Sequence, residues 1–251
     1  MTIDINCDMG ESYGNFKVGN DETIFPHITS CNIACGFHGG DPITIDKTII
    51  QAIKHGVRIG AHPSYPDLMG FGRRNMDLSA EELYALVRYQ VSALKGMTES
   101  LGGQLSYVKP HGALYNTAAN SIIVSKTILN AVRSIDKKIA VMGLAGSIME
   151  QIARVKKISF IAEAFADRQY TDEGKLLSRR EEGAVIHDPF KSAEQVISIV
   201  KDQRVISNTG NFIPIQAQSI CIHGDNPSAV GILLQIENLM KQNGITRYNQ
   251  F

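Results

Sequence analysis

Residues 30–41 read SCNIACGFHGGD, and this stretch shows how the chain is built. A run of small and apolar residues, typical of a buried strand, breaks at Gly36 into a glycine-rich loop that carries His38. Asp41 then precedes Pro42, the residue order expected where an aspartate caps the start of a helix. The stretch therefore predicts a strand, a loop with one titratable side chain at an active-site corner, and a helix.

The same order of elements recurs along the chain. Apolar runs predict strands at 3–7, 31–35, 58–61, 106–109, 139–144, 159–165 and 220–223. Helical patterns predict helices at 43–55, 80–101, 122–135, 147–155, 193–203 and 228–242. Alternating strands and helices indicate a mostly parallel sheet. The sequence shows no internal repeat and no low-complexity linker, so we expect a single domain over residues 1–251.

Side-chain alternation at the strand ends distinguishes a barrel from an open sheet. Asn6 and Asp8 share one face of the first predicted strand. Four other strands carry polar groups at or near their C-terminal ends, namely His62, Lys109 with His111, Glu163, and His223 with Asp225. An open sheet would spread these groups along an edge, whereas a closed sheet brings them to one mouth, where barrel enzymes do their chemistry. The pattern predicts a seven-stranded (β/α) barrel.

The composition excludes several classes of partner. Lysine plus arginine equals aspartate plus glutamate, at 25 each, and no basic block occurs, which argues against a nucleic-acid or acidic-membrane partner. No signal peptide and no apolar run of about 18 residues is visible, so a cytoplasmic location is expected. The four cysteines lie in strand-like runs without zinc-clasp spacing, and we expect buried free thiols.

Six residues are candidates for catalysis: Asp8, His38, His62, Lys109, His111 and Glu163. Asp8 can serve as a general base or a metal ligand, or simply cap a turn. Lys109 shares a face with His111, so we expect it to have a depressed pKa and to polarise a carbonyl, unless it only extends to solvent. Glu163 is the only charge in a long apolar run, which is costly unless the carboxylate is paired or used.

Five further residues are candidates for substrate binding: Asn6, Arg168, Arg179, His223 and Asp225. Asn6 would point inward and donate to Asp8 or to a substrate carbonyl. Arg168 and Arg179 lie in the long loop 167–189, where one arginine can clamp a carboxylate with two hydrogen bonds. His223 and Asp225 form either an oriented His–carboxylate pair or an ordinary turn. A second long loop covers residues 63–78, and long loops of this kind are often functional.

Motifs of several enzyme classes are missing from the sequence. The glycine-rich loop is not a Walker A motif, and we find no nucleophile elbow and no dinucleotide fingerprint. The available groups are Asp, Glu, His and Lys. They favour acid–base or metal-assisted hydrolysis over nucleophilic or redox chemistry.

Six ordered motifs resemble those of the LamB/YcsF family: NCDMGE at 6–11, CNIACGFHGGD at 31–41, GAHPSYPD at 60–67, VKPHGALYN at 108–116, EAFADRQYTDEGKLLSR at 163–179 and CIHGDNPSA at 221–229. The resemblance implies a (β/α) barrel of the glycoside hydrolase/deacetylase type. It also implies opening of 5-oxo-L-proline to L-glutamate, coupled to hydrolysis of ATP to ADP and phosphate. ATP would be a co-substrate held by this chain or by one of two partner subunits, B and C.

Two other functions remain open at this point. A metal-dependent amidohydrolase of the polysaccharide deacetylase kind would need no ATP, and Asp8, His38 and His62 would be its metal ligands. Against it, both histidines of those enzymes lie in one short motif, whereas here they come from different strands. A non-catalytic regulatory or carbohydrate-binding barrel would expose aromatic platforms, yet the chain has no tryptophan and only 7% aromatic residues.

Overall fold

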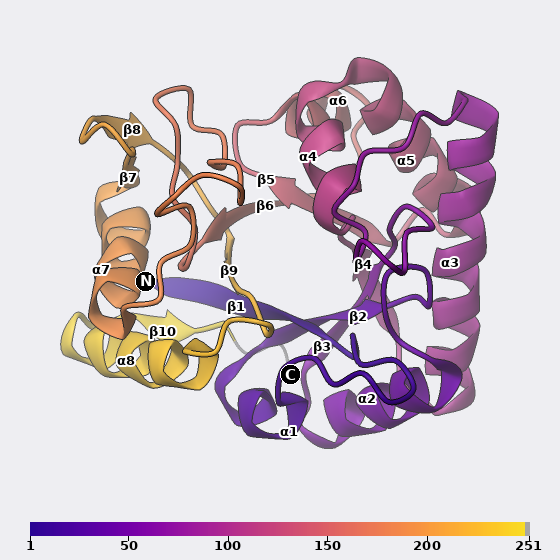
Figure 1. The fold of residues 1–251 in the computed structure, drawn as a ribbon, viewed down its shortest axis with the longest axis horizontal. Helices are drawn as coiled ribbons and strands as arrows, with labels where there is room; N and C mark the ends of the chain where they lie inside the picture. Colours follow the sequence, from indigo (N-terminus) through magenta and orange to yellow (C-terminus); the bar gives the residue numbers. More distant parts are fainter. Residues whose placement is uncertain (249–251) are drawn as a thin grey trace.

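Seven parallel strands close into a barrel in the computed structural model, which describes residues 1–248 (Figure 1). The strands are β1 (Thr2–Met9), β2 (Ser30–Ala34), β3 (Arg58–His62), β4 (Leu105–Val108), β5 (Ala140–Leu144), β6 (Phe160–Phe165) and β9 (Ser219–Ile222). They pair in this order, and β9 returns to β1 with Asn6 opposite Cys221. The predicted seven-stranded (β/α) barrel is confirmed. A short strand, β10 (Thr246–Arg247), adds to the start of β1.

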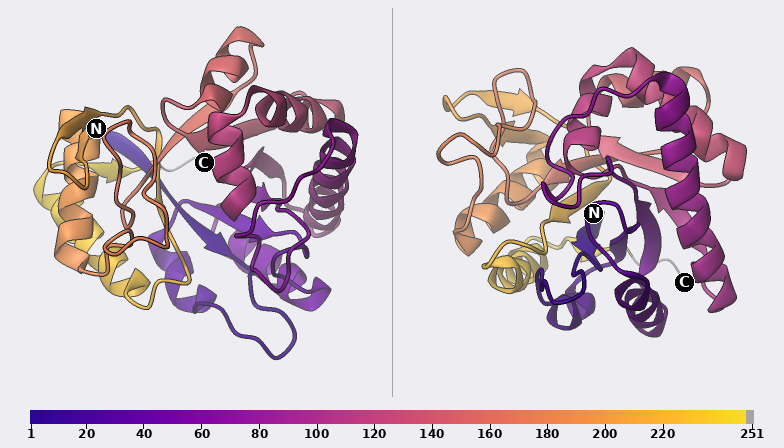
Figure 2. Two further views of the ribbon diagram at one scale, coloured as in Figure 1. Left: turned by 45° about the horizontal axis from the view of Figure 1, so that its top comes forward. Right: turned by 45° about the vertical axis from the view of Figure 1, so that its right-hand side comes forward.

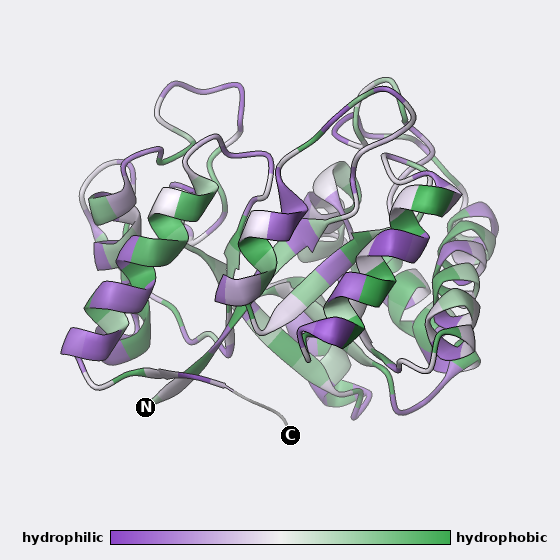
Figure 3. Ribbon diagram, turned by 90° about the horizontal axis from the view of Figure 1, so that it is seen from below, coloured by the Kyte–Doolittle hydropathy of each residue, from purple (hydrophilic) through white to green (hydrophobic). Residues whose placement is uncertain are grey.

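Helices cover the outside of the barrel (Figures 1 and 2). They are α1 (Asp21–Ile24) with the 3₁₀ turn Phe25–His27, α2 (Pro42–Lys54), α3 (Ala80–Ser100), α4 (Gly112–Asn120), α5 (Ile122–Ile135), α6 (Ile148–Val155), α7 (Pro189–Ile197) with the π turn Ser198–Asp202, and α8 (Ala229–Gln242). Hydrophobic and hydrophilic residues alternate along them (Figure 3), as expected when one helix face packs on a sheet. None of the helices within residues 1–248 is long and apolar enough to span a membrane.

The local signals for the helices are confirmed. The Asp41 side chain accepts a hydrogen bond from the Thr44 backbone N–H at 2.9 Å and caps α2. Ser79 and Glu82 form a capping box at the start of α3. The sequence did not predict α4, which follows His111 directly, nor the antiparallel hairpin of β7 (Arg204–Ile206) and β8 (Phe212–Pro214). The predicted helix 193–203 also begins four residues too late.

A group of polar residues fills the N-terminal end of the barrel, opposite the strand ends that hold the candidate site residues. Asp4 accepts hydrogen bonds from Thr29 Oγ1 at 2.7 Å and Ser30 Oγ at 2.6 Å, and it pairs with Arg58. Tyr107 is fully buried above it, next to Gly60. A Cβ at Gly60 would lie 2.2 Å from the Tyr107 ring, so only glycine fits there. This layer closes the barrel from below and leaves its C-terminal mouth as the accessible end.

Candidate active site at the barrel mouth

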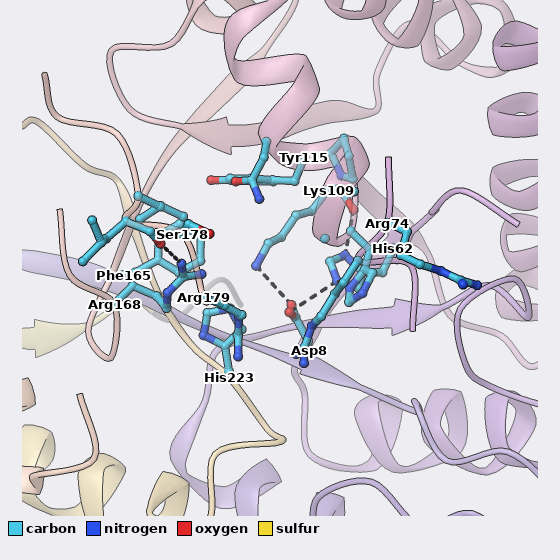
Figure 4. Close-up of a pocket in the computed structure, with 18 of the residues that line it drawn as sticks. Asp8, His62, Arg74, Lys109, Tyr115, Phe165, Arg168, Ser178, Arg179 and His223 are labelled. Carbon is cyan, nitrogen blue, oxygen red and sulfur yellow. Dashed lines mark hydrogen bonds and ion pairs between the residues drawn. The ribbon is translucent and has the colours of Figure 1, made fainter. Parts of the chain in front are cut away.

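A cavity of about 500 Å³ opens at the C-terminal ends of the strands (Figure 4). Asp8 of β1, His62 of β3, and Lys109 and His111 after β4 line it. Residues of both long loops add to the lining, including Arg73, Arg74, Arg168 and Arg179, as do Tyr115, Phe165 and His223. The structure therefore gathers most of the predicted site residues in one place, because parallel strands in a barrel end at the same mouth.

Lys109 lies at the centre of the site and is 2% exposed. Its Nζ atom is 3.0 Å from Asp8 Oδ1, 2.8 Å from Glu163 Oε1 and 3.1 Å from Cys221 Sγ. Burial alone would lower the pKa of Lys109, but the charges around it, foremost that of Asp8, raise the pKa well above its ordinary value. The expected depression of this pKa is wrong. Lys109 is a permanent cation at neutral pH.

Asp8 is the anionic partner of this cation and also contacts a histidine (Figure 4). Its Oδ1 atom accepts from Asn32 Nδ2 at 2.8 Å, and its Oδ2 atom lies 3.3 Å from His62 Nε2. Burial raises the pKa of Asp8, but His62 and Lys109 outweigh this and hold the pKa well below its ordinary value. The carboxylate is therefore ionised and available as a base or a ligand.

Asn6 and Glu163 lie one layer below the cavity, and both are fully buried. Asn6 Nδ2 donates to Glu163 Oε1 at 2.9 Å and to Ser219 Oγ at 2.8 Å, while Asn6 Oδ1 accepts from Asn32 at 2.7 Å. The hydrogen-bonding groups of Asn6 are thus engaged inside the barrel, and Asn6 does not line the cavity. In this position it can orient Glu163, and it accepts a hydrogen bond from Lys109 Nζ at 3.3 Å, but it does not reach the cavity.

Three histidines form a packed cluster beside Asp8. The rings of His38 and His111 stack with their centroids 3.7 Å apart and their planes within 3° of parallel. The ring of His62 stands at a steep angle to both. Burial lowers the pKa of His38 and of His111 well below the ordinary value. Gly72 of the loop 63–78 covers the cluster, and a Cβ at Gly72 would lie 2.8 Å from His111 Cδ2.

Glu11 joins this histidine cluster, and the sequence pattern did not single it out. Its Oε1 atom is 3.1 Å from His38 Nε2 and 3.5 Å from His111 Nδ1. Burial, with the nearby Asp8 charge, raises the pKa of Glu11 well above its ordinary value. The only sequence signal was its place three residues after Asp8 in the first strand-end motif. Ligand atoms of Glu11 and the three histidines all lie within 4.8 Å of one another.

His223 pairs with Asp167 instead of Asp225, so of the two alternatives for these residues the His223–Asp225 pair is wrong and the turn is confirmed. His223 Nδ1 lies 2.8 Å from Asp167 Oδ1. Strand alternation stops at Ile222, and the chain turns at Gly224, which directs Asp225 away toward Arg73 at 2.5 Å. Asp167 follows β6, which runs beside β9 in the barrel, and this adjacency places it against His223.

The Asp167–His223 pair predicts a pH-dependent contribution to stability. Burial raises the pKa of Asp167, but His223 and hydrogen bonds lower it more, so the folded pKa lies below the ordinary value. The carboxylate then stabilises the fold above its unfolded pKa of about 3.9, and this stabilisation is lost as the pH falls through the folded pKa. We expect Asp167→Asn to lower the free energy of unfolding by about 1–3 kcal/mol at pH 6.

Urea unfolding between pH 6 and pH 3 measures this contribution. The difference between wild type and Asp167→Asn should shrink as the pH falls below about 4. Asp202→Asn is the matched control, because Asp202 is exposed and pairs with the exposed Arg204. A stability difference for Asp167→Asn that stays constant over this range would contradict the assignment.

The two predicted substrate-binding arginines differ in how strongly they are already bound to other groups of the protein. Arg168 is 5% exposed, and it donates to the carbonyl oxygens of Leu177 and Ala184 within its own loop. Burial and the neighbouring Arg179 lower the pKa of Arg168 to about 10. Arg179 Nη1 lies 3.9 Å from Asp225 Oδ2, which is longer than a hydrogen bond, and Arg179 lines the cavity. Arg168 shapes the loop, and Arg179 has a guanidinium group available for a ligand.

Comparisons with known proteins give consistent matches over nearly the whole chain. The model of the LamB/YcsF family matches residues 3–250. The 5-oxoprolinase A subunit of Acinetobacter baylyi is 51% identical over 98% of this chain and 96% of its own length. The protein of the same name from Bacillus cereus is 47% identical over 98% of this chain and 97% of its own length.

Solved structures agree with the barrel. The crystal structure of a lactam utilization protein from Thermus thermophilus superposes with a TM-score of 0.93, at 39% identity, over all of both chains. A peptidoglycan N-acetylglucosamine deacetylase domain from Eubacterium rectale superposes with a TM-score of 0.52 at 10% identity, over 98% of this chain and 88% of that domain. The second similarity concerns the fold alone, and it agrees with the deacetylase-type barrel expected from the sequence.

Proposed function

The chain belongs to the LamB/YcsF family, and we propose on this basis that it is the A subunit of a 5-oxoprolinase, a hydrolase that opens 5-oxo-L-proline to L-glutamate. The observation that carries the proposal is the identity of about half of all residues, over almost the full length, to relatives that bear the name of the 5-oxoprolinase A subunit. The alternative of a non-catalytic barrel is disfavoured, because it leaves the buried cation and carboxylates at the mouth without a use.

The cavity has the size and charge that a small anionic lactam requires. Its volume of about 500 Å³ falls within the usual range of small-molecule sites. Arg179 can bind the substrate carboxylate, because its guanidinium group faces the cavity and its contact with Asp225 is long. The Lys109 ammonium group can then redirect the hydrogen bond that it gives to Cys221 Sγ to the lactam carbonyl oxygen and stabilise the negative charge that develops there. Lys109 acts as a fixed cation in this proposal, since its pKa is raised.

Asp8 supplies the proton chemistry. The ionised carboxylate contacts His62, and His62 contacts His111, so the two histidines hold Asp8 in place. Asp8 can take a proton from the attacking nucleophile and return it to the lactam nitrogen. Glu163 and Asn6 keep Lys109 charged and oriented from below.

We also propose that ATP hydrolysis drives the reaction and that the chain acts with two partner subunits, B and C. An unstrained five-membered lactam is a stable amide, so its opening needs an external driving force. The relatives are named as subunits, which supports a multi-subunit assembly. Because the sequence lacks a Walker A motif, the partner subunits are candidates for holding ATP.

Release of glutamate and ADP from 5-oxoproline tests the proposal in a reconstituted mixture. We expect both products only when this chain and the candidate B and C subunits are present together. Omission of any one of the three should abolish glutamate formation. Amide hydrolysis by this chain alone, without ATP, would contradict the proposal and favour a deacetylase-like amidohydrolase.

Arg179→Ala should weaken substrate binding with little change in turnover. Loss of one charged hydrogen-bond donor to the substrate carboxylate is expected to raise KM by about 10- to 100-fold. Steady-state kinetics on the reconstituted enzyme separate KM from kcat. Arg154→Ala is the control, because Arg154 is largely exposed on α6 and pairs with Glu150 of the same helix. An unchanged KM in Arg179→Ala would assign the carboxylate to another arginine.

A further inference from the structure

Two nitrogen atoms of the histidine cluster face each other at hydrogen-bond distance. His62 Nδ1 lies 2.7 Å from the carbonyl oxygen of Lys109, and His111 Nε2 lies 2.8 Å from that of Phe71. A carbonyl oxygen only accepts hydrogen bonds, so both of these nitrogens carry protons. In two neutral rings the remaining nitrogens, His62 Nε2 and His111 Nδ1, then present lone pairs to each other at 2.9 Å. A proton or a metal ion between them relieves this repulsion, and the carboxylate of Asp8, with Oδ2 at 3.3 Å from His62 Nε2, favours either positive charge.

A carboxylate oxygen completes the group. Glu11 Oε1 lies 3.5 Å from His111 Nδ1, and the ligand atoms of Glu11, His62 and His111 lie within 4.8 Å of one another. Two ligands bonded at about 2.0 Å to a tetrahedral metal ion are roughly 3.3 Å apart. The separations of 2.9 and 3.5 Å lie on either side of this value. The two backbone carbonyls also fix the ring tautomers, as outer partners of metal-bound histidines commonly do.

His38 belongs to the cluster but is not placed as a ligand alongside His111. A metal ion bound to an imidazole lies close to the plane of the ring. The rings of His38 and His111 are parallel within 3° and stacked at 3.7 Å, so one ion cannot lie in both planes. His38 Nε2 instead contacts Glu11 Oε1 at 3.1 Å and can orient that carboxylate.

We propose that Glu11, His62 and His111 bind a divalent first-row transition-metal ion, with Zn²⁺ as the probe. Two imidazoles and one carboxylate form a donor set that suits such ions. This set differs from Asp8, His38 and His62, which the sequence suggested. His62 and His111 belong to the lining of the cavity and Glu11 lies behind it, so the ion would lie at the edge of the cavity, where a metal can polarise a carbonyl or activate water.

Calorimetric titration of the full chain, stripped of metal with a chelator, tests this site with Zn²⁺. We expect one ion per chain, and we expect Glu11→Gln and His62→Ala to weaken binding by at least about 100-fold. His223→Asn is the matched control, because His223 belongs to a second potential ligand group with Asp8 and Cys221. It should change affinity by less than about threefold. Glu11→Gln is nearly isosteric, and equal Tm values for the metal-free proteins exclude misfolding.

Two outcomes would overturn the proposal. If the wild type binds Zn²⁺ no more tightly than Glu11→Gln does, Glu11 is not a ligand and the proposed site is wrong. If binding is lost in His223→Asn but kept in Glu11→Gln, the ion belongs to the other group. The visible absorption of Co²⁺, which depends on ligand type and geometry, gives a second readout of the same variants. The inference rests on ligand geometry and is measured without 5-oxoproline, so its failure is distinguishable from failure of the proposed function.

Discussion

Replacing Lys109 with methionine is expected to abolish lactam opening and to destabilise the fold. The change removes the cation between Asp8 and Glu163 and leaves both carboxylates buried without this partner. Breaking a buried ion pair in this way costs about 3–5 kcal/mol of unfolding free energy. Loss of the group that stabilises the developing oxyanion lowers kcat by about 100- to 1,000-fold or more. Urea unfolding of the chain and kinetics of the reconstituted enzyme measure the two effects separately.

A second substitution separates charge from packing at this site. In the Lys109→Met background, Glu163→Gln removes one of the unpaired buried charges, so we expect it to restore part of the stability but none of the activity. Lys95→Met on α3 is the control, because its ion pair with Glu99 is at the surface and should change stability by less than about 1 kcal/mol. If Lys109→Met were as stable as the wild type, the buried ion pair would not hold the site together.

Asp8→Asn is expected to lower activity as strongly as Lys109→Met does. Asparagine keeps the shape of the side chain and can still pair with Asn32, but it removes the negative charge that contacts both Lys109 and His62. Without this charge His62 loses its anionic partner, and we expect kcat to fall by about 100- to 10,000-fold. Steady-state measurement of glutamate release from the reconstituted complex gives this number.

The loss of stability in Asp8→Asn should be smaller than in Lys109→Met, because Glu163 remains as a counter-charge for the lysine. Asp202→Asn serves again as the control, since Asp202 is exposed and its ion pair with Arg204 lies at the surface. Glutamate release near the wild-type rate in Asp8→Asn would remove Asp8 from the proposed mechanism and leave the base to the histidine cluster.

The sequence determined the barrel and the location of the site. Period-two alternation and apolar runs identify the seven strands because these signals are local, and caps such as Asp41 and the Ser79–Glu82 box mark helix starts for the same reason. Polar groups on five strand ends then indicate a shared mouth, because closure of a parallel sheet brings those ends together. The motifs also identified the family, and the full-length match confirms it.

Only the tertiary structure decided which of these groups pair and which charges they carry. Lys109 and Asp8 are 101 residues apart, and His223 and Asp167 are 56 apart, so their contacts depend on strand order and register. From the sequence, Lys109 was expected beside a histidine and with a depressed pKa. In the folded barrel Asp8 and Glu163 also lie next to Lys109, and they raise its pKa instead. Glu11 likewise becomes a candidate ligand only because the fold brings three histidines from other parts of the chain next to it. The pKa of a side chain and the ligands of a metal ion depend on which groups lie close in space, and the tertiary structure determines which groups these are.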